Sequence, residues 1–176
     1  MSESRRRPLV AVVGRGDIGR DHPLWQAARE VGRGVVDAGC RLATGGLGGV
    51  MEAASRGARS SPSYREGDVV GLLPGRDSAA ANDAVDIVLA TGLGDGRNLI
   101  LANSDAVIAV GGGAGTLLEI AAAWKGRACI IALQGEGWSG ELAGRRIDDR
   151  RPSPVLGAGT PAEALDHLRA WVEGRG

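Results

Sequence analysis

The stretch AVIAVGGGAGTLLE, residues 106–119, decides how this chain is expected to fold. It begins with five apolar residues that no polar residue interrupts, which is typical of a strand covered on both faces in a parallel sheet. A glycine-rich segment follows at once, and apolar residues at helical spacing then continue from Thr116 to Trp124. The stretch therefore predicts one unit of strand, glycine loop and helix.

The same alternation recurs along the chain. Further strands are expected at Leu9–Val13, Arg41–Ala43, Val69–Leu73, Ile87–Ala90 and Cys129–Leu133. Further helices are expected at Pro23–Ala38, Val50–Arg59, Arg97–Asn103 and Ala162–Val172. This alternation predicts the α/β class, here a single doubly wound, Rossmann-like domain with a mostly parallel sheet over residues 8–176. Residues 1–7 are predicted to form a disordered tail, and residues 60–68 and 135–154 to form surface loops.

The composition argues against several classes of protein. The 21 basic and 21 acidic side chains give a net charge of +0, and aromatic residues make up 3% with no Phe. A nucleic-acid partner is therefore not expected, because such proteins need a positive surface or aromatic stacking platforms. No apolar run approaches the length of a membrane span, so no membrane partner is expected. Cys40 and Cys129 are too few for a disulfide framework or a zinc site, which predicts a cytoplasmic protein without a bound metal.

Glycine supplies 30 of the 176 residues, and its usual share is only about 7%. Many of these glycines fall in three loops, at residues 14–19, 44–49 and 111–116, each of which follows a predicted strand. Because such loops open at one edge of a parallel sheet, their peptide N–H groups can converge on a phosphate beside a helix N-terminus. The alternative is that the glycines only permit tight turns and close packing. On the first interpretation the ligand-binding residues are Gly14, Gly16, Gly45, Gly46, Gly48, Gly49, Gly111, Gly112, Gly113, Gly115 and Thr116.

The loops do not match the common cofactor motifs. The segment Gly14–Gly19 has the G-x-G-x-x-G spacing, but the next helix is expected only from Pro23 and no acidic residue ends the second strand. NAD is therefore not expected. No lysine follows the loop at residues 111–116, so it is not a Walker A motif. The one lysine, Lys125, lies at a helix end, which is a poor place for a Schiff base with pyridoxal phosphate (PLP).

Two charged residues beside the loops are candidates for catalysis. Glu119 lies directly behind the third loop, where a carboxylate could contact a ribose or act as a general acid or base. The spacing from Thr116 to Glu119 is also that of a helix capping box, and it recurs at Thr160–Glu163 without any glycine loop. Arg97 either binds a phosphate through its guanidinium group or is a solvated arginine at a helix start. Weaker candidates of the same kind are Arg15, His22 and Glu52.

Three segments together resemble the LOG-like Rossmann superfamily, namely TGGLGGVM at 44–51, GDGRN at 94–98 and GGGAGTLLE at 111–119. That superfamily includes the cytokinin-activating phosphoribohydrolases, often mislabelled lysine decarboxylases, the molybdenum cofactor carrier proteins and, more distantly, the DNA-processing protein DprA. The phosphoribohydrolases carry a PGGxGTxxE signature, and this chain has its GGxGTxxE part from Gly112 to Glu119. Gly111 stands in place of the proline. The triple glycine together with GDGRN looks more like the carrier branch.

The resemblance implies a binding protein for a phosphorylated, ring-bearing ligand, most closely a carrier of molybdenum cofactor or a binder of a related pterin or nucleotide. The alternative that it implies is a nucleoside 5'-monophosphate phosphoribohydrolase, in which Glu119 and Arg97 cleave the N-glycosidic bond. A DNA-handling protein like DprA is a third possibility, against which the balanced charge argues. Members typically form dimers or tetramers through helices, so a homo-oligomer is expected. A PLP-dependent lysine decarboxylase is not expected.

Overall fold

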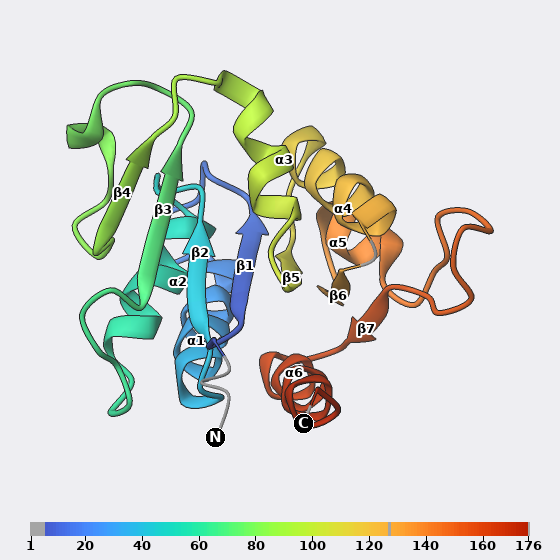
Figure 1. Ribbon diagram of the computed structural model, residues 1–176. Helices are drawn as coiled ribbons and strands as arrows, with labels where there is room; N and C mark the ends of the chain where they lie inside the picture. The colour runs from blue at the N-terminus through green and yellow to red at the C-terminus, as the bar shows by residue number, and fades with distance from the viewer. Residues whose placement is uncertain (1–5, 127, 176) are drawn as a thin grey trace.

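The computed structural model describes residues 6–126 and 128–175. In this part of the chain a seven-stranded sheet has the order β4-β3-β2-β1-β5-β6-β7, and neighbouring strands are parallel (Figure 1). The strands are β1 (Leu9–Gly14), β2 (Arg41–Thr44), β3 (Val69–Leu73), β4 (Ile87–Ala90), β5 (Ala106–Val110), β6 (Cys129–Leu133) and β7 (Leu156–Ala158). The predicted α/β fold with a parallel sheet is confirmed.

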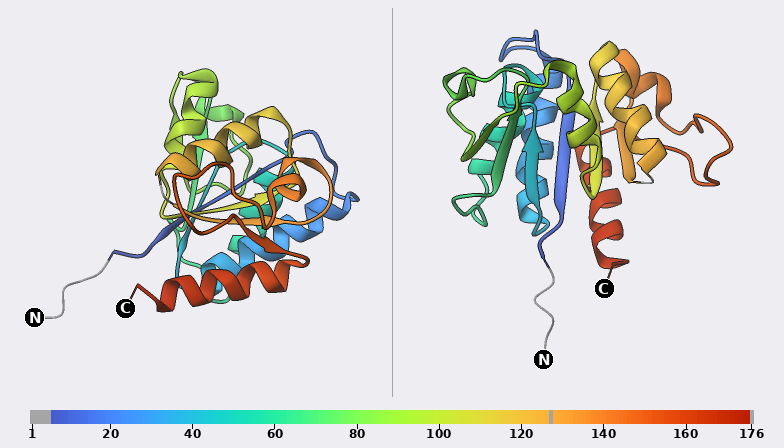
Figure 2. Two further views of the ribbon diagram at one scale, coloured as in Figure 1. Left: turned by 90° about the vertical axis from the view of Figure 1, so that its right-hand side faces the viewer. Right: turned by 45° about the horizontal axis from the view of Figure 1, so that its top comes forward.

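Helices cover the sheet in two layers. They are α1 (Pro23–Asp37), α2 (Val50–Arg59), α3 (Arg97–Ala102), α4 (Ala114–Gly126), α5 (Gly137–Leu142) and α6 (Pro161–Glu173), with short 3₁₀ turns η1 (Ser78–Ala80) and η2 (Gly94–Gly96). Helices α1, α2 and α6 lie on one face, and α3, α4 and α5 lie on the other (Figure 2). Among the residues that the structure describes, no helix has the length and apolar character needed to cross a membrane.

Side chains of β1 alternate between the two layers. Val10 and Val12 belong to the core under α1, α2 and α6, whereas Ala11 and Val13 belong to the core under α3 and α4. All four are buried. Because both faces of β1 and β5 are covered, these strands are apolar without interruption, as the sequence indicated.

Helices α1 and α2 approach each other through glycine. A Cβ atom at Gly32 would lie 2.0 Å from the carbonyl oxygen of Ala54, and one at Gly57 would lie 1.9 Å from the carbonyl oxygen of Arg29. A larger residue at either position would force the helices apart. These two glycines therefore serve packing, which accounts for part of the glycine excess.

The structure adds two elements to those expected and extends one expected helix by two residues at each end. The segment 135–154, expected to be a surface loop, contains α5, a six-residue helix whose sequence GWSGEL includes two glycines. Strand β7 has only three residues and includes Gly157, so its apolar pattern is too short to recognise. Helix α4 begins at Ala114, two residues before the predicted start at Thr116. The segment 60–68 contains neither helix nor strand, as expected.

The folded domain extends slightly further toward the N-terminus than expected. Of the tail predicted at residues 1–7, residues 1–5 lie outside the described residues. Arg6 pairs with Asp105 at 2.7 Å, and Arg7 pairs with Asp68, whose side chain is only 2% exposed. A buried carboxylate needs such a partner. Arg7 is therefore part of the domain.

Candidate functional site

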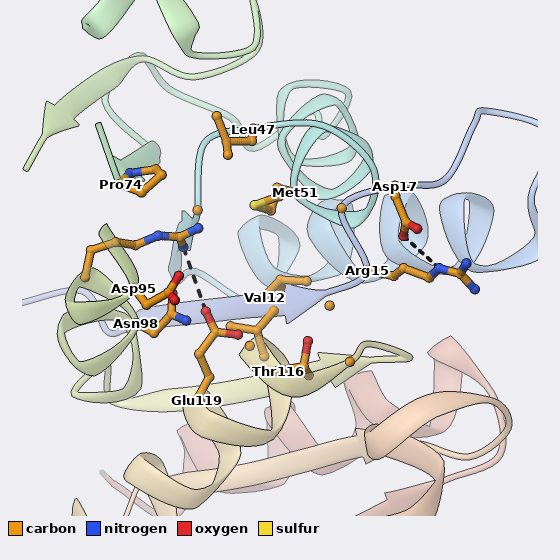
Figure 3. A pocket seen from close by; sticks show the side chains of 17 residues that line it. Val12, Arg15, Asp17, Leu47, Met51, Pro74, Asp95, Asn98, Thr116 and Glu119 are labelled. Atoms are coloured by element: carbon orange, nitrogen blue, oxygen red, sulfur yellow. Dashed lines mark hydrogen bonds and ion pairs between the residues drawn. The ribbon is translucent and has the colours of Figure 1, made fainter. Parts of the chain in front are cut away.

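A cavity of about 370 Å³ lies where three of the loops at the carboxyl edge of the sheet meet. Val12 and Val13 of β1 contribute to its lining, and the loops after β1 and β2 and the first turns of α3 and α4 surround it (Figure 3). The chain leaves β1 toward β2 on one side and returns to β5 on the other. The strand order thus reverses here, which is where doubly wound sheets bind ligands.

The cavity brings together residues from all three predicted glycine loops and both predicted catalytic residues. Those that line it are Gly14, Gly16, Gly45, Arg97, Gly113, Gly115, Thr116 and Glu119. Five other glycines predicted to bind ligand lie outside this lining. They are Gly46, Gly48, Gly49, Gly111 and Gly112.

Gly45 makes room for the guanidinium group of Arg97. A Cβ atom at Gly45 would lie 2.3 Å from Nη1 of Arg97 and 2.5 Å from Sδ of Met51. The arginine therefore reaches from the start of α3 to the end of β2. Only glycine at position 45 permits this arrangement.

Two glycines of the second loop hold that loop against its neighbours. Gly49 has a φ of +61°, and a Cβ atom there would lie 2.4 Å from the carbonyl oxygen of Arg15. The next residue, Val50, donates its N–H to the same carbonyl oxygen at 2.8 Å. The carbonyl oxygen of Gly46 accepts the N–H of Asn82, in the segment between β3 and β4, at 2.9 Å. Both glycines are thus used in joining loops.

The third loop is braced by the start of α5 through Ser139. The N–H of Gly111 donates to Oγ of Ser139 at 2.7 Å, and the same hydroxyl donates to the carbonyl oxygen of Leu133 at 2.8 Å. The N–H groups of Trp138 and Ser139 donate in turn to the carbonyl oxygens of Gly112 and Gly111. The Gly111 N–H is therefore already engaged within the protein. Ser139 escaped the sequence analysis because its segment had no recognisable helical pattern.

Replacing Ser139 by alanine is expected to destabilise the protein by about 1–3 kcal/mol, because the N–H of Gly111 and the carbonyl of Leu133 would stay buried without a partner. Urea unfolding measures the change. Ser153→Ala is the control, since Ser153 is exposed, and it should change stability by less than about 0.5 kcal/mol. Equal stability of Ser139→Ala and the wild type would show that the brace does not hold the loop.

Arg97 and Glu119 form a buried pair across the cavity. Nη1 of Arg97 lies 3.8 Å from Oε1 of Glu119, and the two side chains are 11% and 8% exposed. Burial raises the pKa of the Glu119 carboxyl to about 7, and the charge of Arg97 opposes this rise. Burial also lowers the pKa of Arg97, against the charges of Glu119 and Asp95. Among the described residues, Nε of Arg97 is buried without a hydrogen-bond partner, so this donor remains available to a ligand.

The capping-box spacing occurs at Thr116–Glu119 and at Thr160–Glu163, and the two pairs have different roles in the structure. At the start of α6, Oγ1 of Thr160 accepts from the N–H of Glu163 at 3.2 Å, and the Glu163 carboxylate accepts from the N–H of Gly159 at 2.6 Å. In α4 the helix starts at Ala114, so Thr116 already lies inside it. The capping interpretation of Glu119 is therefore wrong, and its side chain points to the cavity instead (Figure 3).

The weaker candidates are engaged in local contacts. Nε of Arg15 pairs with Asp17 at 2.8 Å at the cavity rim. Nδ1 of His22 accepts the N–H of Leu24 and so caps α1. Glu52 pairs with Arg56 at 2.7 Å and with Arg20 at 3.0 Å, and it does not line the cavity.

Several residues of the cavity were not predicted individually, although four of them lie in the segments 44–51 and 94–98 that carry the family resemblance. Their common feature is a place in the strand-end loops or at the start of a helix. They are Asp17, Leu47, Met51, Pro74, Asp95 and Asn98. Within the described residues, no three His, Cys, Asp or Glu side chains gather in a way that would hold a metal ion.

Comparison with known proteins places the chain among proteins of the same fold. The model of the SLOG cluster4 family matches residues 7–165. An uncharacterized protein of Archaeoglobus fulgidus is 38% identical over 164 residues, which cover 90% of this chain and 92% of that protein.

Two solved structures of molybdenum cofactor proteins are similar over nearly the whole chain. The molybdenum cofactor binding protein from Rippkaea orientalis is 34% identical with a TM-score of 0.82, covering 96% of this chain and 99% of that chain. The molybdenum cofactor carrier protein from Chlamydomonas reinhardtii is 30% identical with a TM-score of 0.75 and the same coverage of 96% and 99%. DNA processing protein A from Helicobacter pylori shares the fold alone. It is 17% identical with a TM-score of 0.60, covering 92% of this chain and 80% of that chain.

Proposed function

The chain belongs to the SLOG cluster4 family, and from this premise we propose that it binds a phosphorylated, ring-bearing ligand and carries molybdenum cofactor or a related pterin or nucleotide. The observation that carries the proposal is Arg97, whose side chain lines the cavity and whose buried Nε has no hydrogen-bond partner among the described residues. Such a donor is costly unless a ligand uses it. A guanidinium group beside a helix N-terminus suits a phosphate.

The cavity suits such a ligand in size and in its polar groups. Its volume of about 370 Å³ lies within the range of small-molecule sites, roughly 300–1,000 Å³. Gly113, Gly115 and Thr116 belong to the loop and first turn of α4, where peptide N–H groups and the helix dipole favour an anion. Gly14 and Gly16 bring the backbone of the first loop to the opposite wall, beside the side chains of Arg15 and Asp17.

The relatives support the same class of ligand. The proteins from Rippkaea orientalis and Chlamydomonas reinhardtii are described as binding or carrying molybdenum cofactor, and both cover this chain nearly completely. In this chain Arg97 and the first turn of α4 would hold the phosphate of that cofactor. When bound, the cofactor would be cargo for delivery, and the chain's own groups would bind and shield it.

Native mass spectrometry of protein purified gently from its own host tests the proposal. We expect a bound mass that matches a phosphorylated pterin or nucleotide, released when the protein is denatured. Thermal unfolding supplies the second measurement, with added molybdenum cofactor, GMP or AMP as probe. The proposal fails if the purified protein carries no phosphorylated molecule and none of the three probes raises the melting temperature.

A second candidate function is favoured by the pKa of Glu119. A carboxyl group with a pKa of about 7 suits general acid–base catalysis at neutral pH, as cleavage of a nucleoside 5'-monophosphate by water to free base and ribose 5-phosphate requires. Under this alternative Arg97 holds the phosphate or ribose. Incubation with AMP would then release adenine, and Glu119→Gln would bind AMP without turnover. Equal release by both proteins would remove Glu119 from the mechanism.

We further propose that the chain forms a homo-oligomer. On the side of α3 and α4, the edge strand β4 lacks a covering helix (Figure 1), whereas parallel sheets are normally covered on both faces. The large apolar side chains exposed on this side and on the neighbouring segments are Ile87, Leu89, Leu93, Leu99, Ile100 and Leu118. Native mass spectrometry also counts the subunits, and a monomer at micromolar concentration would contradict this part of the proposal.

A further inference from the structure

The two ends of the cavity have different chemistry. Arg15 and Asp17 lie at one end, near the glycine loop that follows β1 (Figure 3). Leu47 and Pro74 lie at the other end, on the same side as Asp95 (Figure 3). The first turn of α4 lies between the ends and favours the phosphate. A flat ring attached to that phosphate can then contact the apolar side chains of Leu47 and Pro74 at the second end.

Asp95 is the acidic group at this apolar end. It lies in η2, directly before α3, and lines the cavity as an exposed residue. The ion pairs of the cavity join Arg97 to Glu119 and Arg15 to Asp17, so they leave Asp95 without a partner among the described residues. Its carboxylate is therefore available to a ligand.

A carboxylate distinguishes ring systems by their hydrogen-bonding edges. An ionised carboxylate only accepts hydrogen bonds, and it binds best to two parallel donors. The 2-amino-4-oxopyrimidine ring of a pterin or of guanine offers such donors, a ring N–H beside an amino group. Adenine offers one amino group beside a ring nitrogen that also accepts, which a carboxylate repels.

On the basis of the proposed function, we propose that Asp95 is the specificity-determining residue of this site and selects ligands whose ring carries the 2-amino-4-oxopyrimidine edge. Pterins and guanine nucleotides are then the substrate class, and adenine nucleotides are poor ligands. Leu47 and Pro74 would contact the ring, and Asp95 would accept from its edge. Because hydrogen bonds to charged groups are strong, the preference for guanine over adenine is expected to be about 10- to 100-fold in affinity.

Asp95 could instead act only through Arg97, whose pKa its charge raises. In that case Asp95→Asn would weaken every phosphorylated ligand by the same factor, because the phosphate is common to all of them. Selection of the ring predicts a different result, since only ligands with the donor edge would lose affinity. The pattern across ligands therefore separates a specificity role from a positioning role.

Calorimetric titration of the full chain with GMP, IMP, AMP and a pterin monophosphate tests the proposal. The wild type should bind GMP and the pterin most tightly, IMP less tightly because it lacks the amino group, and AMP weakest. Asp95→Asn should lose at least about 10-fold in affinity for GMP and the pterin and keep its affinity for AMP. Asp149→Asn, at a fully exposed surface aspartate, should match the wild type with all four ligands.

Each other outcome is decisive. If the wild type binds AMP as tightly as GMP, or if Asp95→Asn weakens all four ligands equally, ring selection by Asp95 is wrong while phosphate binding stands. If no ligand binds to the wild type, the proposed function itself fails and this inference fails with it. Circular dichroism of Asp95→Asn confirms that a loss of binding does not reflect unfolding.

Discussion

Arg97→Met is expected to weaken binding of a phosphorylated ligand by about 10- to 150-fold, which corresponds to the 1.5–3 kcal/mol of a hydrogen bond to a charged group. The guanidinium group lines the cavity, its side chain is 11% exposed, and its Nε has no partner among the described residues. Methionine keeps much of the side-chain length but donates no hydrogen bond and carries no charge. Titration with GMP or a pterin monophosphate measures the loss.

Arg145→Met is the matched control, because Arg145 is exposed and lies outside the cavity. This variant removes the same charge from the chain, so a general electrostatic effect would appear in both variants. We expect the control to bind like the wild type. If Arg97→Met retained wild-type affinity, Arg97 would not contact the phosphate, and the main support for the proposed function would be lost.

Arg97→Met should also change how the free energy of unfolding depends on pH. Arg97 opposes the rise in the pKa of Glu119, so its removal should move that pKa above about 7. At about pH 8 the variant then buries a carboxylate without its cation and should be less stable than the wild type. At about pH 6 Glu119 is mostly protonated, so the difference should be small.

The fold was largely predictable because β1 and β5, at the centre of the sheet, are apolar throughout. The uninterrupted segments at residues 9–13 and 106–110 are typical of strands covered on both faces, and their alternation with helical segments predicts the α/β class. Helix α5 and strand β7 were not predictable in the same way. They have six and three residues and contain glycine, so tertiary contacts define them more than any local pattern.

The site was predictable as a region but not glycine by glycine. The sequence places all the glycine loops at one edge of the sheet, and the cavity lies there. The sequence does not show which peptide N–H groups of these loops are free to bind a ligand. Gly113 lines the cavity, whereas the N–H of Gly111, two residues earlier, donates to Ser139. That difference depends on a hydroxyl 28 residues away in the sequence, which no local spacing reveals.

Glu119 shows how the register of a helix decides the role of a residue. The same spacing caps α6 at Thr160 and Glu163. In α4 the glycine loop allows the helix to begin at Ala114, which turns Glu119 toward the cavity. Its pairing with Arg97 follows from the packing of α3 against α4, and the sequence alone left the role of each residue open.

The wild type is expected to lose about 3 kcal/mol of unfolding free energy as the pH rises, and Glu119→Gln is expected to abolish this loss. Burial raises the pKa of Glu119 from its ordinary value of 4.5 to about 7, and the side chain is 8% exposed. Between these two pH values the folded protein binds more protons than the unfolded chain. The wild type therefore loses stability as the pH rises through this window, and the loss is complete above about pH 7. Glutamine does not titrate, so the variant lacks this loss.

Urea unfolding at several pH values from about pH 4.5 to about pH 8 measures the effect. Other ionisable groups contribute to both proteins, so the difference in unfolding free energy between variant and wild type isolates Glu119. The unfolding free energy of Glu119→Gln relative to that of the wild type should rise by about 3 kcal/mol between about pH 4.5 and about pH 8. Glu141→Gln, at an exposed glutamate, should give a difference that stays within about 0.5 kcal/mol.

The double variant Arg97→Met with Glu119→Gln tests whether the pH dependence of stability comes from the ion pair of Arg97 and Glu119. With neither charge present, the pH dependence assigned to Glu119 should be absent, as in Glu119→Gln. At about pH 8 the double variant should be more stable than Arg97→Met, because no buried carboxylate remains without its cation. A wild type whose stability relative to Glu119→Gln does not change with pH would show that the carboxyl has an ordinary pKa. In that case it would be hydrated and already ionised near neutral pH, and a role as the general acid of the alternative hydrolase would have to be abandoned.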